Sequence, residues 1–172
     1  LFPYTTLFRS GFLYTQGYFS QHITEDGWQE ARQSDLKFDN LPVFPILKED
    51  GSPITISVDL PGREVHARIW EIRVGRVPLY LLDSNVEENN EEDKKLTARL
   101  YSSDLDLRIS QEIILGIGGV RALRVLGYNP GVWHMNEGHS AFLSFERIRE
   151  RVSGGQSFED AQQSVIQNNV FT

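Results

Sequence analysis

A short apolar run that ends in polar residues and leads into an amphipathic helix constrains the fold of this chain most. The run covers residues 132–135, the polar residues include Asn136, Glu137 and His139, and the helix is expected over residues 140–152. In an open α/β sheet, ligands bind outside the carboxyl ends of the strands, where a strand turns into a helix. The sequence therefore predicts a binding site at this turn.

The elements around this turn have the order that α/β crossover connections require. Apolar residues recur at spacings of three and four over residues 105–126, which indicates a helix. After the strand at 132–135 and the helix at 140–152, a capping box at Ser157 opens another helix, and Val170 begins a further strand. This order is typical of an α/β fold with parallel strands.

An antiparallel meander is expected before these elements, inserted over about residues 52–83. Residues 54–60 alternate between apolar and polar, and two further strand-like runs follow at 65–74 and 77–82. Residues 41–47 contain two prolines and are predicted to form an edge strand or an extended connector. The acidic segment 83–95 that follows the meander is typical of a solvated loop or of the entry to a helix.

Three glycines inside the helix at 105–126 need a reason, because each costs about 1 kcal/mol relative to alanine. Gly116, Gly118 and Gly119 do not fit a dinucleotide-binding loop, since Arg121 stands where the third glycine of that pattern would fall. No strand directly precedes them either. The glycines therefore predict close packing of this helix on a neighbour.

Two further expectations concern buried side chains. Trp28 stands beside the turn at residues 24–27 and is predicted to fill part of the core. In the helix at 140–152, the apolar side is predicted to contain Phe142, Phe145 and Ile148, with Arg147 among the outward-facing charges.

Composition excludes several classes of function. The 172 residues include no cysteine, so disulfides and thiolate chemistry are absent, and a cytoplasmic location is expected. A net charge of -7 argues against nucleic-acid partners, which require clustered Lys and Arg. No apolar run of about 20 residues is present, so no membrane partner is expected.

The first ten residues, LFPYTTLFRS, show neither helical nor strand periodicity and resemble a translated sequencing adapter. We therefore expect residues 1–10 to be a non-native segment. Residues 11–172 are then expected to form a partial domain, an internal fragment of a longer protein, because Met135 is the sole methionine and a strand begins at the last residues.

The polar cluster allows three interpretations. Asn136, Glu137 and His139 offer the donors and acceptors that sugar hydroxyls require. His134, Glu137 and His139 are metal-ligand types, but their spacing differs from the helical HExxH pattern. Alternatively, Asn136 or Ser140 only caps the following helix, and His139 is a satisfied core residue. Residue types alone favour the sugar and structural interpretations equally.

Three stretches together favour the sugar interpretation. They are residues 11–30 (GFLYTQGYFSQHITEDGWQE), 79–123 (LYLLDSNVEENNEEDKKLTARLYSSDLDLRISQEIILGIGGVRAL) and 133–150 (WHMNEGHSAFLSFERIRE). In combination they resemble the α-glucan (glycogen, starch and maltodextrin) phosphorylase family, and its bacterial and archaeal branch most closely. The resemblance extends over residues 11–172.

The resemblance implies an incomplete N-terminal, Rossmann-like half of a GT-B fold. It also implies a parent enzyme that uses inorganic phosphate to release glucose 1-phosphate from the non-reducing end of an α-1,4-glucan. Pyridoxal phosphate would be bound to a lysine of the parent outside this chain, with no cofactor on the fragment. The resemblance also allows a homo-oligomeric parent.

By the same resemblance, Asn136, Glu137 and His139 lie beside the bound sugar, and Asp104 and Arg108 belong to the gate over the cleft. No catalytic, cofactor-binding or metal-binding residue is expected in this chain, which alone should be inactive. The alternatives are a GT-B nucleotide-sugar glycosyltransferase, a non-catalytic carbohydrate-binding module and a metal-dependent hydrolase that uses His134 and His139.

Overall fold

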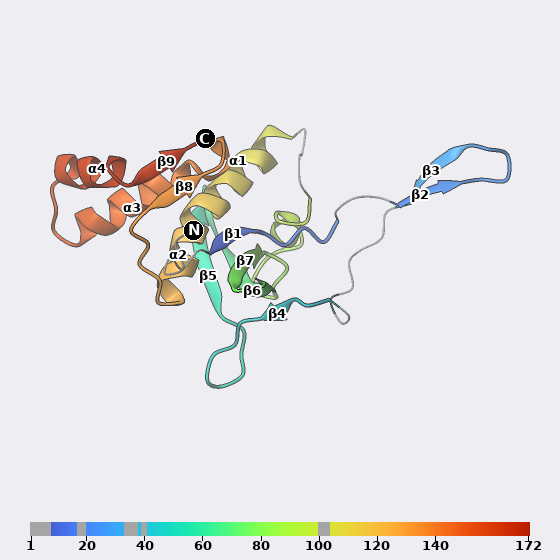
Figure 1. Ribbon diagram of the computed structural model, residues 1–172, viewed down its shortest axis with the longest axis horizontal. Coiled ribbons are helices and arrows are strands. Elements are labelled where there is room, and N and C mark those ends of the chain that lie inside the picture. The colour runs from blue at the N-terminus through green and yellow to red at the C-terminus, as the bar shows by residue number, and fades with distance from the viewer. Residues whose placement is uncertain (1–7, 17–19, 33–37, 39–40, 100–103) are drawn as a thin grey trace.

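A computed structural model describes residues 8–16, 20–32, 38, 41–99 and 104–172 of the chain (Figure 1). At its centre lies the predicted meander of β5 (Thr55–Leu60), β6 (Arg63–Val74) and β7 (Val77–Asp83). Each neighbouring pair is antiparallel. The alternating residues of β5 bury Ile56, Val58 and Leu60, so the predicted half-buried strand is confirmed.

Two shorter strands complete this sheet. β4 (Phe44–Pro45) pairs antiparallel with β6, which confirms the predicted edge strand. β1 (Arg9–Phe12) pairs parallel with β7 on the other side. Arg9 and Ser10, the last residues of the segment predicted to be non-native, lie in β1, whereas residues 1–7 fall outside the described part of the chain. The division at residue 10 stays a prediction.

One long helical stretch covers a face of the sheet, as the apolar spacing predicted. It consists of α1 (Leu105–Ile113), the π-helical segment η3 (Ile114–Gly118) and α2 (Gly119–Val125). A Cβ atom on Gly116 would lie 2.6 Å from the backbone nitrogen of Leu143, and one on Gly118 would lie 3.1 Å from the Ile56 side chain. Gly116 and Gly118 therefore allow close packing, as predicted, whereas the nearest atom to a Cβ on Gly119 would lie 3.7 Å away.

A second, two-stranded sheet follows the helices. β8 (Trp133–Met135) pairs parallel with β9 (Asn169–Phe171). The connection runs through the 3-10 helix η4 (Gly138–Ser140), α3 (Phe142–Ser153) and α4 (Phe158–Ile166). The Ser157 hydroxyl accepts a hydrogen bond from the Asp160 backbone N–H, as the capping box predicted. The parallel crossover is confirmed, and the fold is of mixed α/β class.

The prediction for Trp28 was wrong. β2 (Ser20–Ile23) and β3 (Gln29–Arg32) form a hairpin around the predicted turn, visible at the right of Figure 1. Every residue of both strands is exposed, and Trp28 is 76% exposed. A lone two-stranded ribbon has no covered face, so a tryptophan beside its turn has no core to enter.

The predicted faces of α3 were also partly wrong. Phe145 is 67% exposed, whereas Glu146 and Arg147 are each 2% exposed. Glu146 accepts hydrogen bonds from Arg121 and Arg149, and Arg147 donates to Asn168 and Asn169. A charge that is paired, as in Glu146, or hydrogen-bonded, as in Arg147, can be buried, and hydropathy alone does not register these partners.

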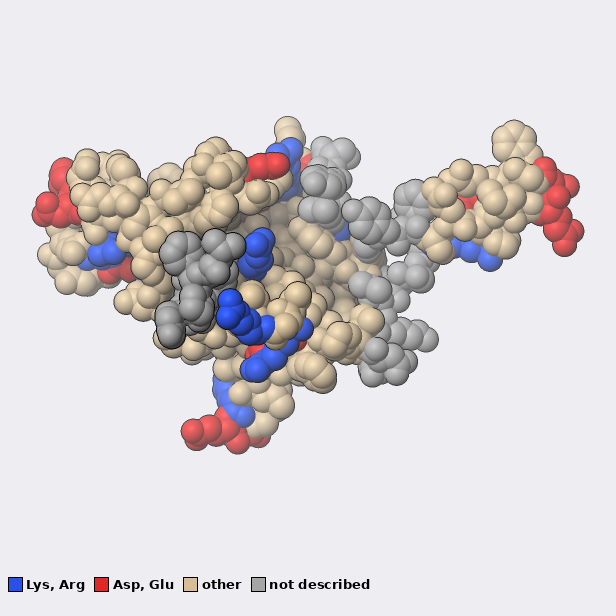
Figure 2. Space-filling model, viewed as in Figure 1, with Lys and Arg blue, Asp and Glu red and all other residues tan. Residues whose placement is uncertain are grey.

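The acidic segment at residues 83–95 includes a short helix, one of the two predicted alternatives, but it is not fully solvated. It contains the short 3-10 helix η2 (Asp93–Lys95), and Asp83, Asn89 and Asp93 are all buried. Figure 2 shows acidic side chains at the hairpin tip and on the loop at the bottom of the view, with Lys and Arg in small groups between them. Among the described residues, no helix is long and apolar enough to cross a membrane.

Candidate functional site

The predicted site lies where β8 ends. Asn136 and Glu137 follow the last residue of this strand and are exposed, and His139 lies within η4. The backbone N–H of Glu137 donates to the Thr172 carbonyl at 2.8 Å, and the backbone N–H of Thr172 donates to the Met135 carbonyl at 3.2 Å. The loop thus stands at the carboxyl ends of two parallel strands, where ligand sites of α/β sheets form.

Glu137 adopts a backbone conformation that is unusual for a residue with a side chain. Its φ is 56° and its ψ is -164°, and it is the sole non-glycine residue with positive φ among those described. This region is almost restricted to glycine and costs about 1–3 kcal/mol for other residues. The Glu137 side chain is 70% exposed. A strained backbone that presents an exposed carboxylate favours a functional interpretation of this loop.

The structure brings the loop together with α1. His139 Nε2 lies 3.4 Å from Glu137 Oε2, and His139 Nδ1 lies 3.9 Å from Glu112 Oε1. The Nε–H group of Arg108 donates to the same Oε1 atom of Glu112 at 3.2 Å. Arg108, Glu137 and His139, which the sequence predicted, therefore form one cluster. Glu112 was missed, although its position four residues after Arg108 on a helix was a usable signal.

Asp104 has a structural role at the start of α1. Its carboxylate accepts hydrogen bonds from the backbone N–H groups of Asp106 and Leu107, at 2.9 and 3.2 Å. Asp104 is thus the N-cap of α1, whereas the gate role of Asp104 and Arg108 stays a prediction.

The structural interpretation of the polar cluster receives no support from the helix starts. Neither η4 nor α3, both fully within the described chain, begins with a side-chain cap hydrogen bond. Asn136 and Ser140 therefore do not cap the following helix. His139 is about one third exposed, so it is not a buried core residue.

The two histidines of the metal interpretation do not converge. The Nε2 atom of His134 lies 2.8 Å from Thr172 Oγ1, on the strand side of the turn. His139 instead faces Glu112 and Glu137. In the described part of the chain, no three His, Cys, Asp or Glu side chains group in a way that could hold a metal ion.

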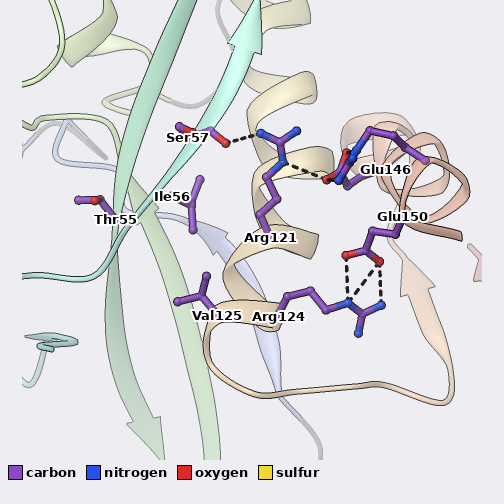
Figure 3. A pocket seen from close by; sticks show the side chains of 9 residues that line it. Thr55, Ile56, Ser57, Arg121, Arg124, Val125, Glu146 and Glu150 are labelled. Atoms are coloured by element: carbon purple, nitrogen blue, oxygen red, sulfur yellow. Dashed lines mark hydrogen bonds and ion pairs between the residues drawn. The ribbon is translucent and has the colours of Figure 1, made fainter. Parts of the chain in front are cut away.

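A separate cleft lies between β5 and the helices α2 and α3 (Figure 3). Arg121 donates to Glu146 at 2.9 Å and to the Ser57 carbonyl at 2.7 Å, and Arg124 pairs with Glu150 at 3.0 Å. Burial alone would raise the pKa of Glu146, but hydrogen bonds from Arg149 and Arg121 outweigh it and lower that pKa. These mutually satisfied charges join the sheet to the helices, and we assign them a structural role.

Two arginines fix the strand that leads into the site. The guanidinium carbons of Arg147 and Arg124 lie 4.9 and 5.5 Å from the centre of the Trp133 ring. Burial lowers the pKa of Arg147 to about 10, with further lowering from the charges of Arg151 and Arg124. This stacking holds β8 in place directly before Asn136.

Comparisons with known proteins now bear on this site. No family model matches the chain. Over 94% of its length, the chain is 44% identical to maltodextrin phosphorylase from Thermococcus litoralis and 45% identical to glycogen phosphorylase from Mycobacterium tuberculosis. It is 37% identical to glycogen phosphorylase from Aquifex aeolicus, again over 94% of the chain. The chain is homologous to a segment of the glycogen and maltodextrin phosphorylases.

This homology confirms the resemblance carried by the three sequence stretches. The matched phosphorylases come from bacteria and an archaeon, in agreement with the predicted branch. The chain spans about a fifth of the length of these curated phosphorylases, with coverage of 20–23% of each.

Proposed function

We propose that this chain is part of an α-1,4-glucan phosphorylase. The enzyme would use inorganic phosphate to release glucose 1-phosphate from the non-reducing end of glycogen, starch or maltodextrin. The observation that supports the proposal most is the 37–45% identity to phosphorylases over 94% of the chain. Phosphorolysis breaks the bond between C1 of the terminal glucose and O4 of the next, bonds C1 to a phosphate oxygen, and delivers a proton to O4.

We further propose that the loop after β8 binds the sugar. The Asn136 amide can donate and accept hydrogen bonds, the Glu137 carboxylate accepts them, and the His139 imidazole can do both. Sugar hydroxyls need this mixture of partners. The strained backbone of Glu137 supports the assignment, because strain persists where the surrounding structure holds a side chain in a required position. Arg108, and Asp104 through the start of α1, would border the same site.

The finer features of the parent enzyme are part of this proposal. The parallel crossover from β8 to β9 would belong to the N-terminal half of a GT-B fold. Pyridoxal phosphate would be held by a lysine outside this chain, and its phosphate would supply acid–base chemistry when bound. No residue described here is assigned to hold it. The enzyme would be cytoplasmic, a homo-oligomer is compatible with the proposal, and the 172-residue chain alone would be inactive.

The test begins with recovery of the native gene together with its flanking DNA. The purified gene product, supplied with maltodextrin and inorganic phosphate, is expected to form glucose 1-phosphate, and the reaction should stop when phosphate is omitted. The 172-residue chain is expected to form none. Transfer from a nucleotide sugar instead of phosphorolysis would assign the protein to the glycosyltransferase alternative.

Site variants test the loop within the same gene product. His139→Ala and Asn136→Ala are each expected to lower kcat/KM by about 10- to 100-fold, the range expected when a charged or polar substrate contact is lost. His66→Ala serves as a matched control, because this histidine lies on β6 and pairs with Glu64. Equal activity of His139→Ala and His66→Ala would refute the site assignment while leaving the phosphorylase proposal intact.

A further inference from the structure

We infer that Glu112 is a positioning residue of the proposed glucan site, which holds Arg108 and His139 in fixed relation. The inference rests on the proposed function. A single carboxylate oxygen, Glu112 Oε1, lies 3.2 Å from Arg108 Nε and 3.9 Å from His139 Nδ1. It therefore links α1 to the loop that follows β8.

The exposure of the four side chains separates Glu112 from its neighbours. Glu137 is 70% exposed, Arg108 56%, His139 35% and Glu112 only 20%. The three exposed groups can reach a ligand that arrives from solvent. Glu112 lies beneath them, so it acts on the ligand through Arg108 and His139.

The contacts of Glu112 also orient the imidazole of His139. Because Nδ1 faces Glu112, Nε2 is directed to the Glu137 side of the loop, where it lies 3.4 Å from Oε2. The ring then presents one defined nitrogen to a sugar hydroxyl, since the roles of the two nitrogens depend on which partner each one meets. A neutral glutamine at position 112 would keep the volume but remove the negative charge that pairs with Arg108 and faces the His139 ring.

The test is a double-mutant cycle in the product of the native gene, with maltodextrin affinity and kcat/KM as readouts. Glu112→Gln is expected to weaken maltodextrin binding by about 3- to 30-fold, within the usual range for coupled neighbours. Glu112→Asp, which keeps the charge, should recover part of the loss. In a His139→Ala background, Glu112→Gln should have a smaller effect than in the wild type, because only the part exerted through Arg108 remains. A merely structural residue would show the same loss in both backgrounds.

Glu150→Gln is the matched control. This glutamate pairs with Arg124, and its side chain is 25% exposed, which is similar to Glu112, but it lies in the cleft of Figure 3. The Glu150→Gln substitution is expected to leave maltodextrin affinity unchanged. Thermal unfolding of every variant shows whether the fold is retained.

Two outcomes would overturn the positioning role. One is a maltodextrin affinity of Glu112→Gln equal to that of the wild type. The other is a double variant whose loss of affinity equals the sum of the losses, in free energy, caused by Glu112→Gln and His139→Ala alone. If the unsubstituted gene product neither binds maltodextrin nor forms glucose 1-phosphate, the proposed function fails first, and the two failures are thereby distinguishable.

Discussion

Two polar turns in this chain each follow the end of a strand, yet their physical character is opposite. At the end of β7, Asp83 is buried and accepts hydrogen bonds from Arg68, from the Trp70 indole and from the Asn85 backbone. After β8, Glu137 is 70% exposed and has a strained backbone. Both turns are acidic and both stand where an α/β sheet could bind a ligand.

This contrast distinguishes a structural polar cluster from a candidate functional one. Asn89 and Asp93 in the first turn are also buried and hydrogen-bonded, so the polarity of this turn is used within the fold. In the second turn, His139 and Glu137 keep much of their surface open to solvent, and the backbone holds a costly conformation. Strain combined with exposure marks the site better than residue type does.

Asp83→Ala tests the structural turn and carries the largest expected effect. The change leaves the Arg68 guanidinium and the Trp70 N–H without their carboxylate, so we expect the free energy of unfolding to fall by about 3–5 kcal/mol. Urea denaturation of the 172-residue chain measures the change. Asp59→Ala is the control, because Asp59 is exposed on the same sheet. A comparable fall in the free energy of unfolding for this variant would contradict the special role of the buried pair.

Gly116→Ala tests the packing that places α1 beside the loop. Alanine normally favours a helix over glycine by about 1 kcal/mol, but here its Cβ would lie 2.6 Å from the Leu143 backbone nitrogen. We expect net destabilisation of about 1–3 kcal/mol, as in overpacked cores. At Gly119 the nearest atom would be 3.7 Å away, so Gly119→Ala should be neutral or stabilising. Equal effects at both glycines in thermal unfolding would rule out the steric explanation.

Glu137→Gly tests whether the second turn sacrifices stability for function. Glycine adopts the positive φ without strain, so we expect the chain to gain about 1 kcal/mol in stability. Maltodextrin affinity of the native gene product should nevertheless fall, because the carboxylate is lost. Glu137→Ala removes the same carboxylate but keeps the strain, so a similar stability gain in both variants would exclude strain as the cause.

The pH dependence of stability probes the paired charges around Glu146 and has the smallest expected effect. The folded-state pKa of Glu146 is lowered from 4.5, because hydrogen bonds from Arg149 and Arg121 outweigh burial. Its contribution to stability is therefore present above pH 4.5 and is lost as the pH falls through the lowered folded-state pKa. Urea midpoints across this range should fall less steeply for Glu146→Gln than for the wild type. Parallel curves would show that Glu146 does not contribute.

Regular patterns in the sequence predicted most of the fold. The alternation at residues 54–60 predicted β5, and the apolar spacing after residue 105 predicted the long helical stretch. Partnerships between distant residues were not predictable in this way. Arg147 is buried because Trp133, Asn168 and Asn169 come to it from other elements, and no local pattern encodes that meeting.

The sequence likewise predicted some features of the candidate site and missed others. The position of the loop after a strand followed from local sequence. Glu112 joined the cluster only because α1 packs beside η4, an arrangement that depends on the bare backbone at Gly116. The backbone strain at Glu137 was not predictable either, because the sequence does not indicate that this glutamate has a positive φ.

The hydrogen bond from Glu137 to the Thr172 carbonyl sets an order of assembly. The strained turn closes onto a strand that the chain reaches only after completing α3 and α4. During synthesis, the backbone N–H of Glu137 cannot make this hydrogen bond until Thr172 has emerged and β9 has paired with β8. A nascent chain interrupted before β9 would therefore carry the side chains of Asn136, Glu137 and His139 without the shape of the proposed sugar site.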